Sequence, residues 1–292
     1  MTPMPRMTRR EVVAAAAGLT LPAAVEPPLD AFAVRSFAPA RLDGVPEGVL
    51  QLDYVGLGGR EDWALVWKPG RDSATWLVNL HGHGSHGDQL FTRPDIRRDW
   101  LPLFRSAGLG ILAPNLRDNA WMCPEAAADL NALLAWARRS LGATRFVLVG
   151  GSMGGSSVLT YCALHPEDVA AAVAVCPAAD LASYYAWLRR RDGGIHAEIA
   201  DAIRTAYRGD PARRRATYNA HSAVRNAVRL TMPLFVGAGT RDEIIPVSQT
   251  RRLAGALAEA DSFAYVEAPD GDHEAPLGLL PAGFRWALQR LD

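Results

Sequence analysis

The chain has 292 residues, 49% of them hydrophobic and 21% charged, which is ordinary globular composition and enough length for one large domain with a buried core. Lys+Arg and Asp+Glu are equal at 31 each, so no global field favours nucleic acid or an anionic membrane as a partner. Cys123, Cys162 and Cys176 are too few and too widely spaced for a disulfide framework or a zinc site, and we interpret them as small buried hydrophobes.

Residues 1–25 have the outline of an export signal. Three arginines in the first ten residues precede a mild apolar run over 12–21 and a few small residues. The run is too short to cross a bilayer, so no stable membrane insertion is expected. Residues 8–13 resemble a twin-arginine signal, although Val12 stands where that pattern prefers Phe. Export to the periplasm or beyond is the hypothesis, and an amphipathic helix on a cytoplasmic protein is the alternative.

Residues 26–48 are rich in Pro and Ala and lack clear periodicity, so we interpret them as a linker or a strap over the core. The main domain is predicted over 49–292. Its first elements are strands over 49–55 and 63–68, which a glycine-rich turn separates. They predict an antiparallel hairpin at one edge of a sheet.

Beyond this hairpin, apolar runs of strand length alternate with helical segments. Hydrophobic strands that alternate with helices indicate an α/β fold, with a mostly parallel sheet and helices on both faces. The predicted strands are 76–80, 110–113, 146–149, 171–176, 234–237 and 263–267, and the predicted helices are 101–107, 124–140, 156–165, 247–260 and 279–290.

Residues 179–231 break this alternation. The stretch is too long for an ordinary loop, and its composition predicts a helical cap insertion over the carboxyl edge of the sheet, where such folds bind ligands. Its two arginine runs, 189–191 and 213–215, are expected on solvated helix faces. Its aromatic residues either line a pocket or pack within the insertion; they include Tyr184, Tyr185 and Trp187.

The nucleophile is predicted from the segment Gly150-Gly-Ser152-Met-Gly154. This is G-x-S-x-G between a strand over 145–150 and a helix that begins near Ser156, the context that an activated serine requires. The glycines permit a sharp turn, and the helix N-terminus offers N–H groups to a developing anion. A phosphate-binding loop is not indicated, because G-x-G-x-x-G and G-K-[ST] are both absent from the segment.

A serine nucleophile needs a base and an acid that orients the base, in the chain order Ser, acid, His for this context. His273 lies between the last predicted strand and the last helix, and it is the predicted base. Asp242 follows the strand over 234–237, and it is the predicted acid. Asp270 and Asp272 are rival acids, disfavoured by their closeness to His273 in the sequence.

The anionic intermediate needs two preorganised donors. The predicted donors are the backbone N–H of Met153, directly after the nucleophile, and that of His83 in a His-Gly-rich loop after the strand over 76–80. Asn115 and Trp121 follow the next core strand and are candidates for the rim of the site, without further support. The sequence identifies no substrate-binding residue.

A metal site is the alternative reading of the same loop. His81, His83 and His86 form His-x-His-x-x-His after a strand, which resembles the metal motif of the metallo-β-lactamase fold. That motif has Asp before the third histidine, where this chain has Ser85.

From about residue 75 to 292 the chain resembles the α/β-hydrolase superfamily, and within it the catalytic domains of prolyl oligopeptidases and related esterases. The resemblance implies a Ser-Asp-His triad, an acyl-enzyme and no cofactor or metal. It is carried by His81-Gly82, the turn at 150–154, Asp242, His273, and the segments Tyr207-Arg-Gly-Asp-Pro211 and Tyr218-Asn-Ala-His-Ser222.

Only about 75 residues precede the core, too few for the β-propeller of that peptidase group. The leading hypothesis is therefore a serine hydrolase that cleaves a small-molecule or carbohydrate carboxylic ester. The alternatives are a small peptidase or amidase of the same fold, a metal-dependent hydrolase that uses the histidine cluster, and a non-catalytic binding protein.

Overall fold

The computed structural model describes residues 32–70 and 73–291. The predicted export signal over 1–25 and the first residues of the predicted linker lie outside this part of the chain. Of the helices that the structure describes, none is both long and apolar enough to cross a membrane.

Nine strands of the described chain form one sheet in the order β1-β2-β3-β5-β4-β6-β7-β8-β9. From β4 outward to β9, and between β4 and β5, neighbouring strands are parallel, whereas β1, β2, β3 and β5 pair antiparallel. The strands are β1 (Ala33–Pro39), β2 (Val49–Val55), β3 (Glu61–Trp67), β4 (Thr75–Leu80), β5 (Gly110–Pro114), β6 (Arg145–Gly151), β7 (Val169–Val175), β8 (Leu234–Gly239) and β9 (Phe263–Ala268).

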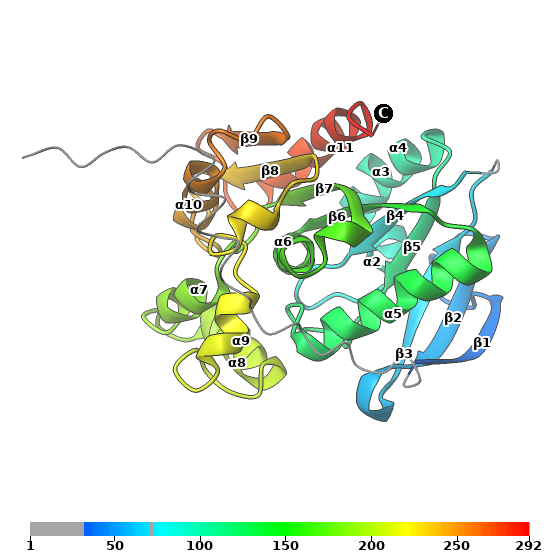
Figure 1. The fold of residues 1–292 in the computed structure, drawn as a ribbon, viewed down its shortest axis with the longest axis horizontal. Helices are drawn as coiled ribbons and strands as arrows, with labels where there is room; N and C mark the ends of the chain where they lie inside the picture. Colours follow the sequence, from blue (N-terminus) through cyan, green and yellow to red (C-terminus); the bar gives the residue numbers. More distant parts are fainter. Residues whose placement is uncertain (1–31, 71–72, 292) are drawn as a thin grey trace, which may run out of the picture.

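Helices cover both faces of the sheet (Figure 1). Strand β4 is buried along its whole length, and its side chains alternate between two cores: Trp76 and Val78 pack on one face, and Leu77 packs on the other. The helices of the first face are α5 (Pro124–Leu141), α6 (Met153–Leu164) and α10 (Ser248–Ala256), and those of the second are α2 (Gln89–Thr92), α3 (Pro94–Asp99), α4 (Leu101–Ser106) and α11 (Leu280–Leu288). The predicted α/β fold is thereby confirmed.

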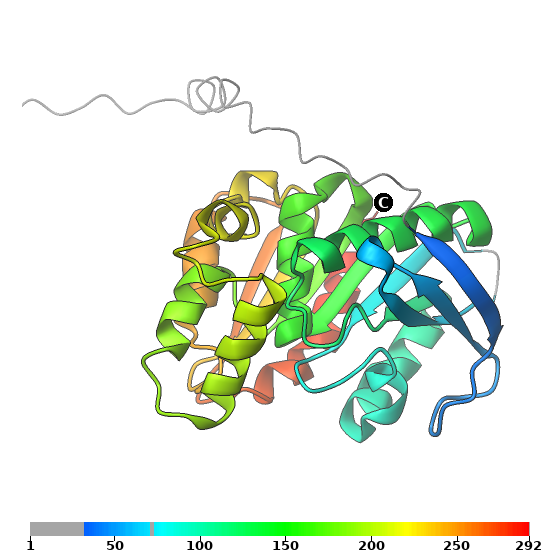
Figure 2. The ribbon, with the colours of Figure 1, turned by 90° about the horizontal axis from the view of Figure 1, so that it is seen from below.

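The main departure from the predicted elements is β1, which lies within the predicted linker of residues 26–48. It pairs antiparallel with β2, so β1 and not the β2–β3 hairpin forms this edge of the sheet (Figure 2). All seven residues of β1 are exposed. The strand therefore has no alternation of apolar and polar residues, the signal by which a strand is found in a sequence.

Between β7 and β8 the chain leaves the sheet and forms three helices side by side, which we call the cap (Figures 1 and 2). They are α7 (Leu181–Leu188), α8 (Gly194–Ala206) and α9 (Arg215–Ala220). Tyr184 is buried, and its hydroxyl donates a hydrogen bond of 2.9 Å to the carbonyl of Ile244. Tyr184 belongs to the core, and the partly buried Tyr185 and Trp187 pack against it. The residues of both arginine runs are exposed.

Candidate active site

Ser152 forms a one-residue turn between β6 and α6. Its φ of 57° and ψ of −122° lie in a region that non-glycine residues rarely adopt. Helix α6 begins at Met153, three residues before the predicted start, because the turn is this tight. A Cβ at Gly154 would lie 2.0 Å from the carbonyl oxygen of Leu80, so the backbone of α6 passes directly against the end of β4.

Ser152, His273 and Asp242 form a continuous chain of hydrogen bonds. The Oγ atom of Ser152 lies 2.8 Å from Nε2 of His273, and Nδ1 of His273 lies 2.7 Å from Oδ2 of Asp242. The three residues follow β6, β9 and β8, whose carboxyl ends meet at one edge of the parallel sheet. In this arrangement the carboxylate fixes the imidazole, and the imidazole can accept the hydroxyl proton.

The carboxylate of Asp242 is fixed by hydrogen bonds to the oxygen that does not face His273. Its side chain is 2% exposed, and its Oδ1 accepts hydrogen bonds of 2.8 Å from the N–H groups of Ile244 and Ile245. The rival acids have other partners: Asp270 pairs with Arg241, and Asp272 accepts N–H groups of its own turn. The geometry thus joins His273 to Asp242.

Two backbone N–H groups next to this chain are available as donors. Met153 is the first residue of α6, so its N–H has no acceptor within the helix. His83 lies in the 81–87 loop after β4, and its N–H donates to no acceptor among the described residues. Its neighbours do: Gly82 donates to Gln89 Oε1 (2.9 Å), Gly84 to Asn119 Oδ1 (2.8 Å) and Ser85 to the Gly82 carbonyl (3.2 Å).

A cavity of about 240 Å³ opens beside Ser152 and His273. Its apolar lining comes from both core and cap: Ile96, Trp100, Ile195, Ile199, Ile244 and Leu277. Arg93 and Glu274 also line it and form an ion pair with each other. The spacing of Ile195 and Ile199, four residues apart on α8, is the one signal in the sequence that could have indicated a part of this lining.

The three histidines of the predicted metal alternative bind different groups. The ring nitrogens of His81 lie 2.9 and 2.7 Å from the carbonyls of Gly82 and Asn115, and burial lowers the pKa of His81. The ring of His83 contacts other side chains, which are described below. Nδ1 of His86 lies 3.3 Å from a carboxylate oxygen of Asp118.

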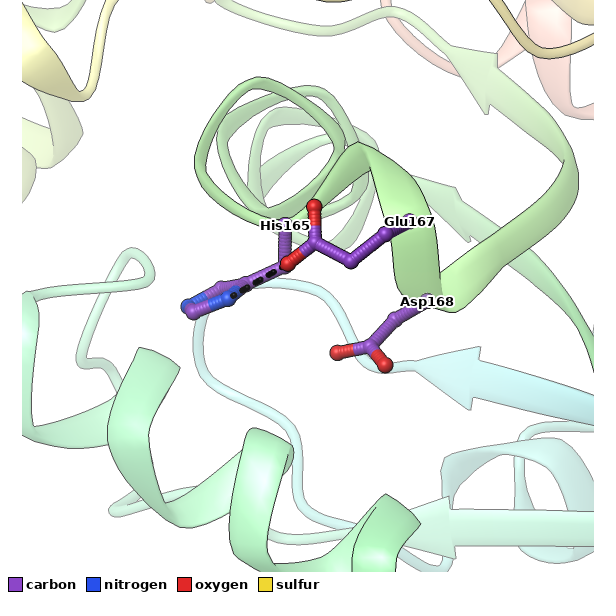
Figure 3. Close-up of side chains that lie close together, drawn as sticks. All are labelled: His165, Glu167 and Asp168. Atoms are coloured by element: carbon purple, nitrogen blue, oxygen red, sulfur yellow. Dashed lines mark ion pairs between the residues drawn. The ribbon is translucent and has the colours of Figure 1, made fainter. Parts of the chain in front are cut away.

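Within the described residues, three candidate ligand atoms come within 4.8 Å of one another at His165, Glu167 and Asp168 (Figure 3). This group lies at the end of α6 opposite Ser152, outside the cavity. The carboxylate of Asp168 already accepts three hydrogen bonds, one of them from a guanidinium; the donors are Tyr161, Asn131 and Arg138. We interpret the group as a link between α5 and α6.

The cysteines are buried as predicted. Cys176, directly after β7, lies in the cavity wall, and burial raises the pKa of its thiol. The thiol is therefore held in the protonated form, which is a poor nucleophile.

Comparisons with known proteins agree with this fold. A family model described as alpha/beta hydrolase fold matches residues 75–196. A monoacylglycerol lipase of Mycolicibacterium smegmatis is 26% identical over 243 residues, which cover 71% of this chain and 84% of the lipase.

Solved structures are similar over most of the chain. Acetyl xylan esterase 1 from Thermoanaerobacterium sp. JW/SL YS485 superposes with a TM-score of 0.65 at 16% identity, over 90% of this chain and 91% of the esterase. A Mycobacterium tuberculosis puromycin-hydrolyzing peptidase superposes with a TM-score of 0.62 at 20% identity, over 81% of this chain but only 38% of the peptidase.

Proposed function

The chain belongs to the α/β-hydrolase superfamily, and on this premise we propose that it is a serine hydrolase that cleaves carboxylic esters through an acyl-enzyme. The observation that carries the proposal is the unbroken chain of hydrogen bonds from Ser152 through His273 to Asp242. A hydroxyl, an imidazole and a buried carboxylate in this order are the parts that acyl transfer needs.

In the acylation step, Nε2 of His273 takes the proton of Ser152 while Oγ attacks the carbonyl carbon of the ester. Asp242 stabilises the imidazolium through Nδ1–H. The tetrahedral intermediate then expels the alcohol, which receives the proton from His273. In deacylation a water molecule gives its proton to His273 and attacks the acyl carbon, and Ser152 leaves with that proton restored.

The negative oxygen of both tetrahedral intermediates would accept hydrogen bonds from the N–H groups of Met153 and His83. The positive end of the α6 dipole lies at the same place and favours the same charge. Removal of one such donor typically lowers kcat by about 10²–10³-fold.

The cavity favours a small and uncharged substrate. Its volume of about 240 Å³ is below the roughly 300–1,000 Å³ of sites for drug-sized ligands. Its lining is mainly apolar, and Arg93 is already neutralised by the carboxylates of Asp95 and Glu274. A short acyl group fits this lining. For the alcohol we propose the glycerol or carbohydrate kind, after the substrates for which the monoacylglycerol lipase and the acetyl xylan esterase are named.

The test is the turnover of short p-nitrophenyl esters by the Ser152→Ala variant. We expect a loss of at least about 10⁴-fold in kcat with an unchanged circular dichroism spectrum. Ser248→Ala, at an exposed position at the start of α10, is the matched control and should retain full turnover. Retained turnover in Ser152→Ala would overturn the proposal.

A panel of esters and the corresponding anilides separates an esterase from an amidase. We expect ester turnover to exceed amide turnover by orders of magnitude. Equal or greater amide turnover, still dependent on Ser152, would assign the chain to the amidase alternative.

A further inference from the structure

Residues 115–122, which follow β5, have a strained backbone, and we call them the strained segment. Five non-glycine residues adopt positive φ values of 48–64° within seven positions: Leu116, Arg117, Asp118, Trp121 and Met122. Such conformations cost free energy and persist only where the surroundings enforce them, often at functional sites. The proposed chemistry of Ser152 uses none of these residues, so their strain needs another reason.

This strained segment binds the 81–87 loop along its length. At one end of the loop, the carbonyl of Asn115 lies 2.7 Å from Nε2 of His81. In the middle, Asn119 Oδ1 accepts the N–H of Gly84 at 2.8 Å. The first contact holds the side chain of His81 and the second holds the peptide that follows His83, whereas the His83 N–H has no acceptor among the described residues.

The imidazole of His83 is held at both nitrogens. The indole N–H of Trp121 lies 3.3 Å from Nδ1, and because an indole can only donate, Nδ1 is the acceptor and the proton is on Nε2. Nε2–H then donates to Oε1 of Glu198 at 3.1 Å. The His83 side chain is 7% exposed, whereas that of Glu198 is 64% exposed.

Glu198 lies on α8 between the two isoleucines that line the cavity. Tyr207, the residue directly after this helix, contacts the strained segment itself: its hydroxyl lies 3.1 Å from the carbonyls of Trp121 and Met122. The cap and the strained segment therefore each contact the His83 ring, one at each ring nitrogen.

We propose that Trp121 and Glu198 are positioning residues that act through the His83 imidazole on the His83 peptide. A ring fixed at both nitrogens restricts both side-chain torsions, and through Cα it restricts the direction of the free N–H. An oxyanion donor must lie about 2.7–3.1 Å from the developing charge, so a small rotation of this peptide weakens the bond. The inference rests on the proposed function, because it concerns the donor to that oxyanion.

The first test compares Glu198→Ala with Glu198→Gln. Loss of one partly exposed hydrogen bond should lower kcat for a p-nitrophenyl ester by about three- to tenfold, with KM within twofold and an unchanged melting temperature. Glu198→Gln keeps an acceptor oxygen and should recover most of the lost kcat. Asp201→Ala, on the same helix and paired only with Arg204 in the described structure, is the control and should retain the wild-type kcat.

The second test is a double-mutant cycle. His83→Ala removes the ring but keeps the backbone N–H, so Glu198→Ala should have no further effect on kcat in that background. Trp121→Phe, which loses the indole donor but keeps an aromatic ring, should lower kcat to a similar extent as Glu198→Ala in the presence of His83 and have little effect in its absence.

Two results would overturn the inference: a wild-type kcat in Glu198→Ala, or the same fold-loss from Glu198→Ala with and without the His83 ring. These results differ from failure of the proposed function, in which Ser152→Ala would itself retain turnover. An inactive Ser152→Ala together with a fully active Glu198→Ala would refute the positioning role alone.

Discussion

The backbone next to the proposed nucleophile leaves no space for a side chain at Gly154. An added Cβ would meet only backbone atoms: the Leu80 oxygen at 2.0 Å, the Leu80 carbonyl carbon at 2.8 Å and the His81 oxygen at 2.9 Å. Backbone atoms at the end of a central strand cannot rotate away as a side chain can. The start of α6 and the 81–87 loop would have to separate.

We therefore predict that Gly154→Ala destabilises the protein by about 3 kcal/mol or more and lowers esterase activity at temperatures where the fold survives. Urea unfolding at 25 °C measures the first effect. Gly255→Ala in α10 is the control, since nothing lies within 4 Å of its added Cβ, and it should stabilise by about 0.4–1 kcal/mol. Equal effects of the two substitutions would show that the close contact at Gly154 is not needed.

At the scale of single residues, the sequence predicts where a residue lies in the fold better than it predicts which side chain that residue contacts. Ser152, Asp242 and His273 each directly or closely follow a strand of a predicted parallel sheet, so their meeting at one edge follows from topology. The contact between His83 and Glu198 joins residues 115 positions apart, on a loop and on a cap helix. Only the packing of the cap brings them together, and no spacing in the sequence encodes it.

Among the elements, the cap gives a structural role to the two segments that carried part of the family resemblance. Tyr207 and Tyr218 stack with ring centroids 4.6 Å apart. The ring nitrogen Nδ1 of His221 lies 3.1 Å from both the Tyr207 hydroxyl and the Met122 carbonyl. These residues bind the cap to the strained segment after β5. The two segments, 207–211 and 218–222, therefore hold the cap against the rest of the domain.

The position of His221 predicts a pH-dependent stability. Burial lowers the pKa of His221 from its ordinary 6.5 to about 4. Between these two values the unfolded chain binds a proton that the folded cap does not bind. His221 should therefore cause no loss of stability above about pH 6.5. As the pH decreases toward 4, it should lower the free energy of unfolding by about 3 kcal/mol in total.

Urea unfolding at pH 7.5 and pH 4.5 measures this loss. A His221→Gln variant, which cannot take up the proton, should lose about 2–3 kcal/mol less than the wild type between the two values. Burial lowers the pKa of His81 in the same direction, so some dependence should remain in the variant. An equal loss in both proteins would exclude His221 as its source.

The elements that the sequence misses are a strand without a buried face and two very short helices. Strand β1 is exposed at every residue, and α2 and α3 have only four and six residues, too few for a helical period to stand out. The strands from β4 to β8 are almost wholly buried, and their continuous apolar runs made them predictable. Burial over a sufficient length, more than propensity, decided which elements could be found.

In the molecule as a whole, one buried ion pair joins three parts of the first core face. Asp129 on α5 pairs with Arg117 of the strained segment at 2.5 Å, and their side chains are 2% and 11% exposed. Asp129 also accepts the N–H of Leu57 at 2.6 Å, in the turn between β2 and β3. The antiparallel part of the sheet, the longest helix and the segment that holds the 81–87 loop thus share one carboxylate.

We predict that Asp129→Ala lowers the free energy of unfolding by about 3–5 kcal/mol, because it leaves a largely buried guanidinium without its counter-ion and the Leu57 N–H without its acceptor. Burial raises the pKa of Asp129 even though the neighbouring Arg117 lowers it, so the charged carboxylate would be costlier still without this cation. Asp201→Ala breaks an ion pair of similar chemistry whose side chains are 61% and 52% exposed, and it should change stability by at most about 0.5 kcal/mol.

Replacement of both Asp129 and Arg117 separates the stabilisation that the ion pair provides from the destabilisation that an unpaired Arg117 causes. Asp129→Leu combined with Arg117→Met should regain a large part of the stability that Asp129→Ala loses, since an apolar pair of similar volume leaves no buried charge. Urea unfolding of the three variants at pH 7 measures the difference. If the double variant is as unstable as Asp129→Ala, the lost hydrogen bond to the Leu57 turn, and not the stranded Arg117, is the main source of the destabilisation.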